Sequence, residues 1–310
     1  MYFRTMNLLM LELKNDKIAI PVVLFAGLIW SFGPLVVRYM DSPQLVPWQY
    51  IFGRGLTIFI MLNLYLFFEE GKNFYKNYYK IGVSGVIGGT GLGIAMISFI
   101  YSITNTSAAV TLLCLAAMPF FTALLGFLFL REKISFNVWI AIIIAAIGII
   151  IIALGNTAQA SIIGLIFGIT SSIGFSVFSV TLRWRKETPK FTTVAFAGLF
   201  CFIVATIFIL GSSQPFFSSS YNGTLFSIHG FLVCSGLILY SIGSKAIPAA
   251  ELTLLSLTEV IGGIFWVWLP WFGINEIPST NTIIGGFFLF ISITYYSLIM
   301  RTNRRFIGLN

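Results

Sequence analysis

Residues 252–271 read LTLLSLTEVIGGIFWVWLPW, and they set one carboxylate, Glu259, in the middle of an otherwise uncharged and largely apolar stretch. A run of roughly 20 such residues is what an α-helix needs to cross the hydrocarbon core of a bilayer. A charged side chain at the bilayer centre costs on the order of 3 kcal/mol by insertion scales, so such groups face water, pair with a cation or carry a proton. The stretch therefore predicts a transmembrane helix that turns an acid toward the protein interior.

The whole chain has the composition of a membrane protein. Hydrophobic residues make up 58% of the sequence and charged residues only 9%, whereas about 25% of a soluble domain is charged. The mean hydropathy is +0.96. The three cysteines, Cys114, Cys201 and Cys234, all lie in apolar segments, where packing is a better explanation than a disulfide framework. We therefore expect an all-α, polytopic membrane protein.

Ten stretches are apolar and long enough, or nearly so, to span a bilayer. They cover residues 18–39, 47–68, 81–104, 106–130, 136–154, 162–183, 192–210, 223–244, 248–272 and 281–300. The first stretch lacks the short core and the cleavage site of a secretory signal, so we interpret it as a retained helix. Ten spans put both termini on the same side of the membrane.

The basic residues fit this count. If the N-terminus is cytoplasmic, the cytoplasmic segments hold all of the 18 Lys and Arg residues except Arg38, in an outer loop, and Arg54, within a span. Cytoplasmic loops of membrane proteins carry such an excess. We therefore expect a multi-pass protein of the inner or plasma membrane with both termini in the cytoplasm. The net charge of +8 then requires no nucleic-acid partner.

The two halves of the chain share a pattern. TLLCL begins at Thr111 in the fourth stretch and TLLSL at Thr253 in the ninth, each after a pair of alanines, and REKIS and NEIPS follow at the ends of these stretches. Five spans per half would thread the second copy in the opposite direction, an arrangement common in secondary transporters. We therefore predict ten transmembrane helices as two inverted five-helix repeats. The predicted segments are a cytoplasmic N-terminal segment (1–17), the first repeat (18–155), the second repeat (156–300) and a cytoplasmic basic tail (301–310).

Pro119 in the fourth stretch, and Gly262 with Gly263 in the ninth, are candidate hinges. Proline removes a backbone donor and usually kinks a helix. Small residues also let helices approach closely in lipid, so close packing is the alternative explanation for the two glycines.

Four motifs together resemble the EamA-type permeases of the drug/metabolite transporter superfamily. They are LIWSFGPLVV from Leu28, FGRGL from Phe52, MPFFTALLGFLFLREKIS from Met118 and SLTEVIGGIFWVWLPWFGINEIPS from Ser256. Two departures stand out, because Val260 occupies the place of a usual proline and the usual glycine of the fifth helix is replaced around Ala141. Gly285 or Gly286 keeps that glycine in the tenth helix.

The resemblance implies export or exchange of small polar metabolites, such as amino acids, by alternating access through a central cavity. Uptake, or nucleotide-sugar or phosphate antiport of the kind found in the same superfamily, is the alternative. Antiport of such anions would need more than one cation in the cavity, and the sequence offers Arg54 there. Protons are a candidate coupling ion, and the oligomeric state is left open.

The candidate solute site centres on Glu259 and Arg54. With a rise of about 1.5 Å per residue, Glu259 lies roughly 16 Å from the inner face and Arg54 roughly 10 Å from the outer face. The two residues could form a structural pair, a solute or proton site, or both in turn, and Glu259 could also be a neutral, hydrogen-bonded acid. The aromatic residues Trp30, Tyr101, Tyr240 and Trp266 are further candidate solute contacts, with packing or lipid contact as the alternative for each.

An intramembrane enzyme is the rival of a different class. The chain has a single histidine and no H-E-x-x-H or G-x-S-x-G motif, so we expect no enzyme, no metal site and no cofactor. We expect that histidine, His229, near the outer membrane face rather than in a proton relay. We expect Glu132 to make a cytoplasmic hinge or loop contact.

Overall fold

The computed structural model describes residues 16–132, 134–155, 161–185 and 187–307, and all regular structure in these ranges is helical. Residues 1–15 of the predicted N-terminal segment and 308–310 of the predicted tail lie outside the described residues. The helices are α2 (Asp16–Trp30), α3 (Gly33–Arg38), α4 (Pro47–Glu70), α5 (Lys76–Lys80), α6 (Gly82–Asn105), α7 (Ala108–Leu115), α8 (Met118–Leu125), α9 (Phe136–Gly155), α10 (Ile162–Trp184), α11 (Lys190–Gly211), α12 (Ser220–Gly243), α13 (Ala249–Leu255), α14 (Thr258–Trp268) and α15 (Thr280–Ile307). Shorter turns are η1 (Pro43–Leu45), η2 (Gly71–Asn73), η3 (Gly126–Leu130) and η5 (Pro270–Phe272).

Eight segments of the described chain are long and apolar enough to cross a membrane. They are Ile18–Arg38, Pro47–Asn73, Gly82–Asn105, Ala108–Leu130, Ile162–Trp184, Lys190–Gly211, Ser220–Gly243 and Ala249–Trp268. Each coincides with a predicted span to within a few residues. The predicted fifth and tenth spans are helices α9 and α15, whose apolar parts, Phe136–Ile151 and Ile283–Tyr296, are shorter. Eight spans are thus supported, and the count of ten stays a prediction.

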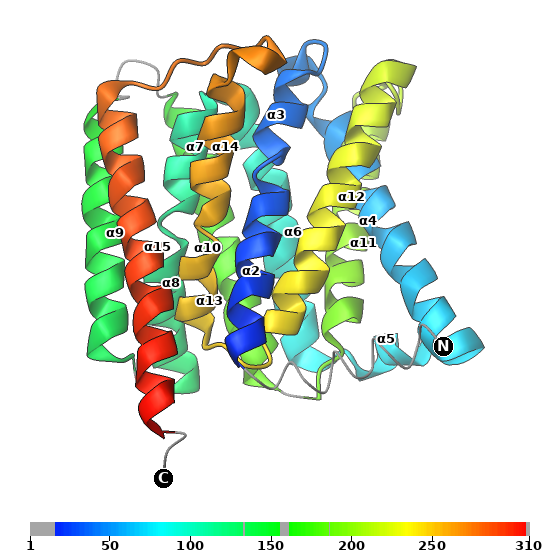
Figure 1. The fold of residues 1–310 in the computed structure, drawn as a ribbon. Coiled ribbons are helices and arrows are strands. Elements are labelled where there is room, and N and C mark those ends of the chain that lie inside the picture. The colour runs from blue at the N-terminus through cyan, green and yellow to red at the C-terminus, as the bar shows by residue number, and fades with distance from the viewer. Residues whose placement is uncertain (1–15, 133, 156–160, 186, 308–310) are drawn as a thin grey trace.

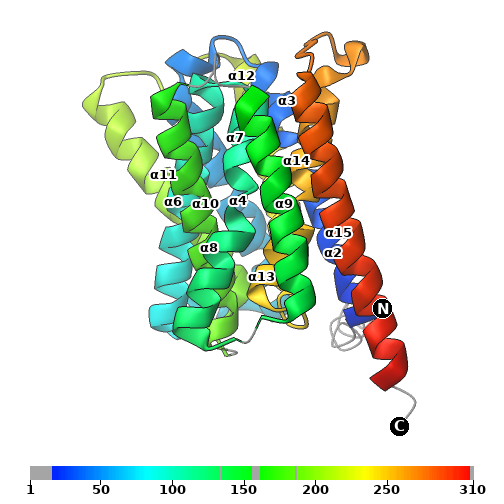
Figure 2. The same cartoon turned by 90° about the vertical axis from the view of Figure 1, so that its left-hand side faces the viewer.

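The helices form an upright bundle in which the largest contacts join one half of the chain to the other (Figures 1 and 2). Helix α6 packs on α10, α4 on α11, α9 on α15 and α2 on α12. The segments α7 and α8 pack on α13 and α14 near the middle of the bundle. The pair α9 and α15 stands at one side of the bundle and the pair α4 and α11 at the other (Figure 1). The hydrophobic core is therefore the interface between the two halves.

Glycines set how closely these pairs approach. In the three pairs α6–α10, α4–α11 and α9–α15, a Cβ added to a glycine would lie 2.6–3.0 Å from a backbone oxygen of the facing helix. The glycine pairs are Gly91 with Gly174, Gly55 with Gly198, and Gly148 with Gly285. Small residues at such crossings let helices pack where lipid offers no hydrophobic driving force. These six glycines are thus explained by helix packing.

Three spans are interrupted midway. The α2–α3 span breaks at Ser31–Phe32, the α7–α8 span at Ala116–Ala117, and the α13–α14 span at Ser256–Leu257. Hydroxyl groups satisfy carbonyls at the breaks, since Ser31 Oγ donates to the Leu28 carbonyl (2.6 Å) and Ser256 Oγ to the Thr253 carbonyl (2.8 Å). An interrupted helix is tolerated in a membrane where side chains pair with the freed backbone groups.

The break in the fourth span agrees with the predicted kink, because Pro119 lies in the first turn of α8, where no backbone donor is needed. The ninth span breaks before the predicted glycines, not at them. Gly262 and Gly263 lie inside α14, where an added Cβ would collide with Ser31 and with Leu112. In the structure these two glycines therefore allow close helix packing. A hinge motion at them stays a prediction.

The two ends of the bundle differ in charge. We call the end at which α3 finishes the Arg38 end, and the opposite end, at which α10 finishes, the Arg183 end. Helix α2 begins and α15 finishes at the Arg183 end (Figure 1). The basic residues in the described segments at that end are Lys17, Lys72, Lys76, Lys80, Arg131, Arg183, Arg185, Lys190, Lys245, Arg301, Arg304 and Arg305. This distribution is the one that the positive-inside rule requires if the Arg183 end is cytoplasmic.

Candidate functional site

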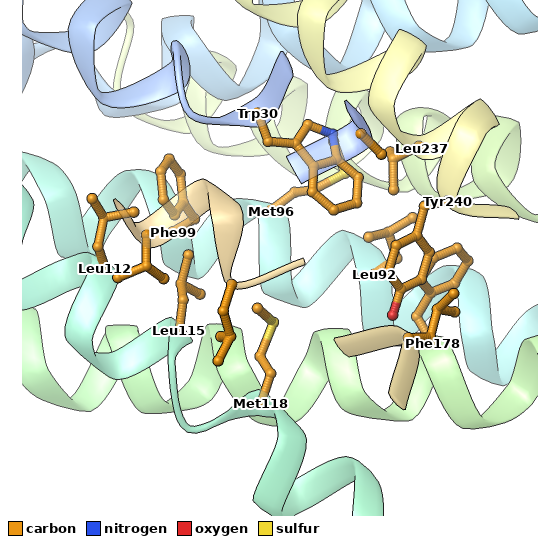
Figure 3. Packing of buried hydrophobic residues seen from close by; sticks show 14 of the residues in the cluster. Trp30, Leu92, Met96, Phe99, Leu112, Leu115, Met118, Phe178, Leu237 and Tyr240 are labelled. Carbon is orange, nitrogen blue, oxygen red and sulfur yellow. The ribbon is translucent and has the colours of Figure 1, made fainter. Parts of the chain in front are cut away.

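A cavity of about 70 Å³ lies at the centre of the bundle. Its wall is mainly apolar and comes from both halves of the chain, with Met96 and Phe99 on α6, Leu115 before the α7–α8 break, and Phe175 on α10. Figure 3 shows part of this wall, where Trp30, Met96, Phe99, Leu115 and Met118 gather around the same space. The polar lining residues are Arg54, Ser171, His229 and Glu259. A mostly apolar space with a few convergent polar groups is typical of a small-molecule site.

Glu259 enters the cavity from the break in the ninth span. It is in the first turn of α14, so the exposed backbone amides and the dipole of that helix favour its negative charge. Its backbone amide donates to the Ser256 carbonyl at 2.9 Å, which fixes the turn that carries it. The break therefore places an acid at the midpoint of the bundle.

Arg54 is the cation of the cavity. Only 2% of the residue is exposed, its Nη2 donates to the Met96 carbonyl, and its Nε has no hydrogen-bond partner. The flanking glycines of FGRGL allow this depth, because a Cβ at Gly53 would collide with Phe226 and one at Gly55 with Cys201. A buried guanidinium with an unfilled donor is a ready partner for an anionic group.

Arg54 and Glu259 line the same cavity without forming an ion pair in this structure. Among the described residues, the ion pairs within 4.0 Å join Arg38 to Glu276 and Arg183 to Glu132. The predicted structural pair is therefore not made here. A guanidinium and a carboxyl group thus face one space without an ion pair between them.

The position of His229 differs from the one predicted from the sequence. It is 2% exposed, lines the cavity and hydrogen-bonds through Nδ1 to the hydroxyl of Tyr50. Helix α12 begins at Ser220, so His229 lies about 13 Å along the helix from its start rather than at the membrane face. The extra turn before the predicted start at Gly223 explains the error.

Trp30 lines the cavity, and Tyr240 stands behind it. The Trp30 Nε1 donates to the Val233 carbonyl at 3.2 Å, and the ring contacts Phe175 and Tyr240. Tyr240 is fully buried and shares a hydrogen bond of 2.7 Å with Ser179. Tyr240 therefore positions the indole ring and does not face the cavity.

The other two predicted aromatic contacts lie elsewhere. Tyr101 stacks on Phe167 and meets the edge of Trp48, away from the cavity lining. Trp266 donates from Nε1 to Ser31 Oγ at 2.8 Å and stacks on Phe32, so it ties α14 to the break between α2 and α3. Packing, the alternative explanation given for these aromatic residues, therefore describes both Tyr101 and Trp266. Of the predicted solute contacts, the cavity gathers Trp30, Arg54 and Glu259.

Most of the apolar lining was not predicted. Residues such as Met96, Phe99 and Phe175 have no mark in the sequence, because every span is rich in similar side chains. Their selection follows from which helices face one another. That information lies in the packing of the two halves.

Comparison with known proteins gives a consistent result. Residues 17–154 match the EamA-like transporter family. An uncharacterised transporter of Helicobacter pylori (strain J99) is 28% identical over 66% of this chain and 67% of its own length, and the uncharacterised transporter YdfC of Bacillus subtilis is 26% identical over 59% and 60%. The pseudopaline exporter CntI of Pseudomonas aeruginosa is 22% identical over 68% and 72%. The chain thus spans about two thirds of the length of these relatives.

A solved crystal structure superimposes on the chain with a TM-score of 0.71, covering 93% of this chain and 99% of the other. The sequence identity is 16%, so this likeness concerns the fold alone.

Proposed function

Because this chain is an EamA-type permease of the drug/metabolite transporter superfamily, we propose that it is a secondary carrier for small polar or amphipathic metabolites. It works by alternating access, with the central cavity as its solute site. It is not an enzyme, and its partners are the solute and the lipid bilayer.

The proposed architecture is ten spans in two oppositely threaded five-helix halves. Each span of the first half corresponds to the span in the same position of the second half, so α2 corresponds to α10, and α6 to α12. The contact of α2 with α12 therefore corresponds to that of α10 with α6, and each of the pairs α4–α11 and α9–α15 corresponds to itself. The breaks in the fourth and ninth spans also correspond. These relations support a two-fold relation in the plane of the membrane, which is the usual frame of carriers with a midplane site.

The proposed solute class is supported by one observation. Arg54 and Glu259 line the same cavity but form no ion pair with each other. A buried charge is costly unless it has a partner. A solute with both an anionic and a cationic group, such as an amino acid, supplies a partner to each. The aromatic wall around Trp30 would take the apolar part of such a solute. A polyanion, as in nucleotide-sugar or phosphate antiport, would find Arg54 alone among the arginines and lysines of the lining.

Export is the proposed direction, and its support is the relative named as an exporter. Protons are the proposed coupling ion, since Glu259 and His229 place two titratable groups in the cavity. The proposed location is the inner or plasma membrane with both termini cytoplasmic, which the basic Arg183 end supports.

The test is transport in proteoliposomes. Labelled amino acids, amines and organic acids are screened with and without a pH gradient, for the unmodified chain and for Glu259→Gln and Arg54→Gln. Each substitution should lower transport of an amino acid by at least about tenfold, because a hydrogen bond to a charged group is worth about 1.5–3 kcal/mol. Glu187→Gln and Arg185→Gln change exposed charges at the Arg183 end and serve as controls. Undiminished transport by both cavity variants would remove this site from the mechanism.

A further inference from the structure

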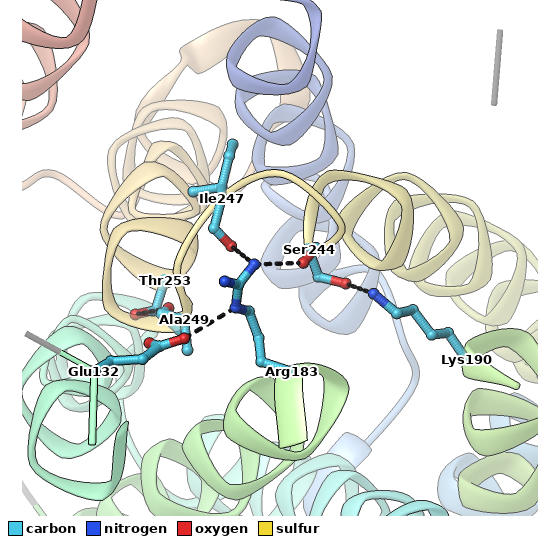
Figure 4. A network of polar contacts seen from close by, with 7 residues as sticks. All are labelled: Glu132, Arg183, Lys190, Ser244, Ile247, Ala249 and Thr253. Atoms are coloured by element: carbon cyan, nitrogen blue, oxygen red, sulfur yellow. Dashed lines mark hydrogen bonds and ion pairs between the residues drawn. The ribbon is translucent and has the colours of Figure 1, made fainter. Parts of the chain in front are cut away.

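An arginine at the Arg183 end joins the two halves of the chain. Arg183, in the last turn of α10, donates from Nε to Glu132 Oε1 at 3.0 Å. Its Nη1 donates to the carbonyls of Ser244 and Ile247, both at 3.2 Å (Figure 4). Lys190 holds the same serine through a hydrogen bond to Ser244 Oγ at 2.7 Å.

An arginine at the other end is held in the same way. Arg38 finishes α3, and its Nε lies 2.5 Å from Glu276 Oε1, in an ion pair whose angle is not that of a hydrogen bond. Its Nη1 donates to the Ile103 carbonyl at 3.1 Å and its Nη2 to the Thr106 carbonyl at 3.0 Å. In both clusters the arginine thus contacts one glutamate from the other half of the chain and two backbone carbonyls from the same half as the arginine.

The positions correspond between the halves. Each arginine ends the first span of its half, and each glutamate follows the fourth span of the other half. The residues before the glutamates, Arg131 and Asn275, both have positive φ angles, of 54° and 52°. The amide of Glu132 then donates back to the Gly126 carbonyl at 3.2 Å, and that of Glu276 to the Val267 carbonyl at 3.0 Å. At Arg131 the left-handed residue ends η3, as is common at helix ends, whereas Asn275 lies in the loop that follows η5.

These contacts divide into two kinds. The carbonyls that hold Arg38 belong to the first half, and those that hold Arg183 belong to the second, so each guanidinium moves with its own half. The bond to the glutamate crosses to the other half. When the halves part at one end, the ion pair of that end has to break while the carbonyl contacts can remain.

We propose that the pairs Arg38–Glu276 and Arg183–Glu132 are two matched latches, each of which closes one end of the solute path and opens in turn during transport. The proposal rests on the carrier function proposed above and adds the gating residues to it. All four side chains are partly exposed, between 19% and 30%, so water can take over the charges when a latch opens. Ion pairs of this kind are weak enough to be exchanged within a transport cycle.

The experiment measures access to the cavity from each side of the membrane. A single reporter cysteine replaces Val233, which lines the cavity, in a chain whose buried Cys114, Cys201 and Cys234 are changed to alanine. The protein is reconstituted with one orientation, and a membrane-impermeant maleimide is added from either side. The variants are Glu276→Gln and Glu132→Gln, which remove one latch charge each and keep the side-chain shape.

Each variant should raise the labelling rate from one side only, by about two- to fivefold, as expected for the loss of a partly exposed ion pair. Glu276→Gln should act from the side of the Arg38 end and Glu132→Gln from the side of the Arg183 end. Asp41→Asn and Glu187→Gln remove exposed carboxylates at the same two ends and should change neither rate. Glu276→Asp and Glu132→Asp keep the charge but shorten its reach, and they give the same pattern if a glutamine variant fails to fold.

Unchanged labelling in the folded variants, or a rise from the same side in both, would overturn the latches. Labelling requires no solute, so it separates this proposal from the proposed function. If the variants label as expected but the protein transports no tested solute, the proposed function is contradicted and the proposed latches are still supported. A protein that transports an amino acid but shows no sidedness contradicts the latches alone.

Discussion

Gly174→Ala is the substitution whose effect the helix contacts define best. Gly174 faces Gly91 across the interface of α6 and α10, and its added Cβ would lie 2.6 Å from the Gly91 carbonyl oxygen and 3.0 Å from the Ala95 nitrogen. Ordinary contact begins at about 3.4 Å, so the two helices would have to part by roughly 0.8 Å. Both helices line the cavity, through Ala95 and Met96 on one side and Ser171 on the other.

The expected cost is about 1–3 kcal/mol, which is typical of an overpacked core. For a chain of 310 residues that corresponds to a fall in the unfolding midpoint of about 1.5 °C per kcal/mol. The measurement is thermal unfolding of the purified protein in detergent, followed by tryptophan fluorescence, beside solute transport.

Gly286→Ala is the matched control, because it lies inside α15 and its added Cβ meets nothing within 4 Å. It should be neutral, or stabilise by about 0.5–1 kcal/mol through helix propensity. Equal midpoints for the two alanine variants would refute the reasoning, since they would mean that the α6–α10 approach is not as close as the structure has it.

Three further predictions concern the cavity and its supports. Trp30→Phe keeps an aromatic ring but loses the hydrogen bond to the Val233 carbonyl, so the KM for the solute should rise by about two- to tenfold with a smaller change in maximal rate. Trp266→Phe loses the bond to Ser31 Oγ outside the cavity, so it should lower the free energy of unfolding by about 0.5–1.5 kcal/mol and leave the KM unchanged, as transport and unfolding measured together will show. Arg54→Gln should weaken transport of amino acids and organic acids by more than that of amines in competition assays, and an equal loss for all three would separate Arg54 from anion recognition.

Eight of the ten predicted spans are supported, and they were predictable from the sequence because the bilayer imposes a length and a polarity on each helix. Glu259 and Arg54 stand out in apolar stretches, and both reach the cavity. The corresponding acids in REKIS and NEIPS were also visible as a repeat. Their ion pairs to Arg183 and Arg38 were not, because the partner lies in the other half of the chain.

The errors have the same physical origin. An aromatic residue in a span gives one signal whether it lines a cavity, as Trp30 does, or packs behind it, as Tyr240 does. The break at Ser256–Leu257 contains neither proline nor glycine, and it depends on hydroxyls that satisfy the backbone locally. The burial of His229 depends on Tyr50, which comes from another helix. Each of these outcomes is decided by lateral packing, on which hydropathy carries no information.

The pairing of every major helix with one from the other half has a consequence for biosynthesis. A ribosome releases α2 through α9 before any of their principal partners exists, so the early spans meet lipid with their glycine-lined faces uncovered. Assembly then has to wait for the later spans. Premature termination near residue 155 would leave a fragment with most of its packing surfaces bare, a natural target for membrane proteases, whereas two separately translated fragments hold all the complementary faces needed to recombine.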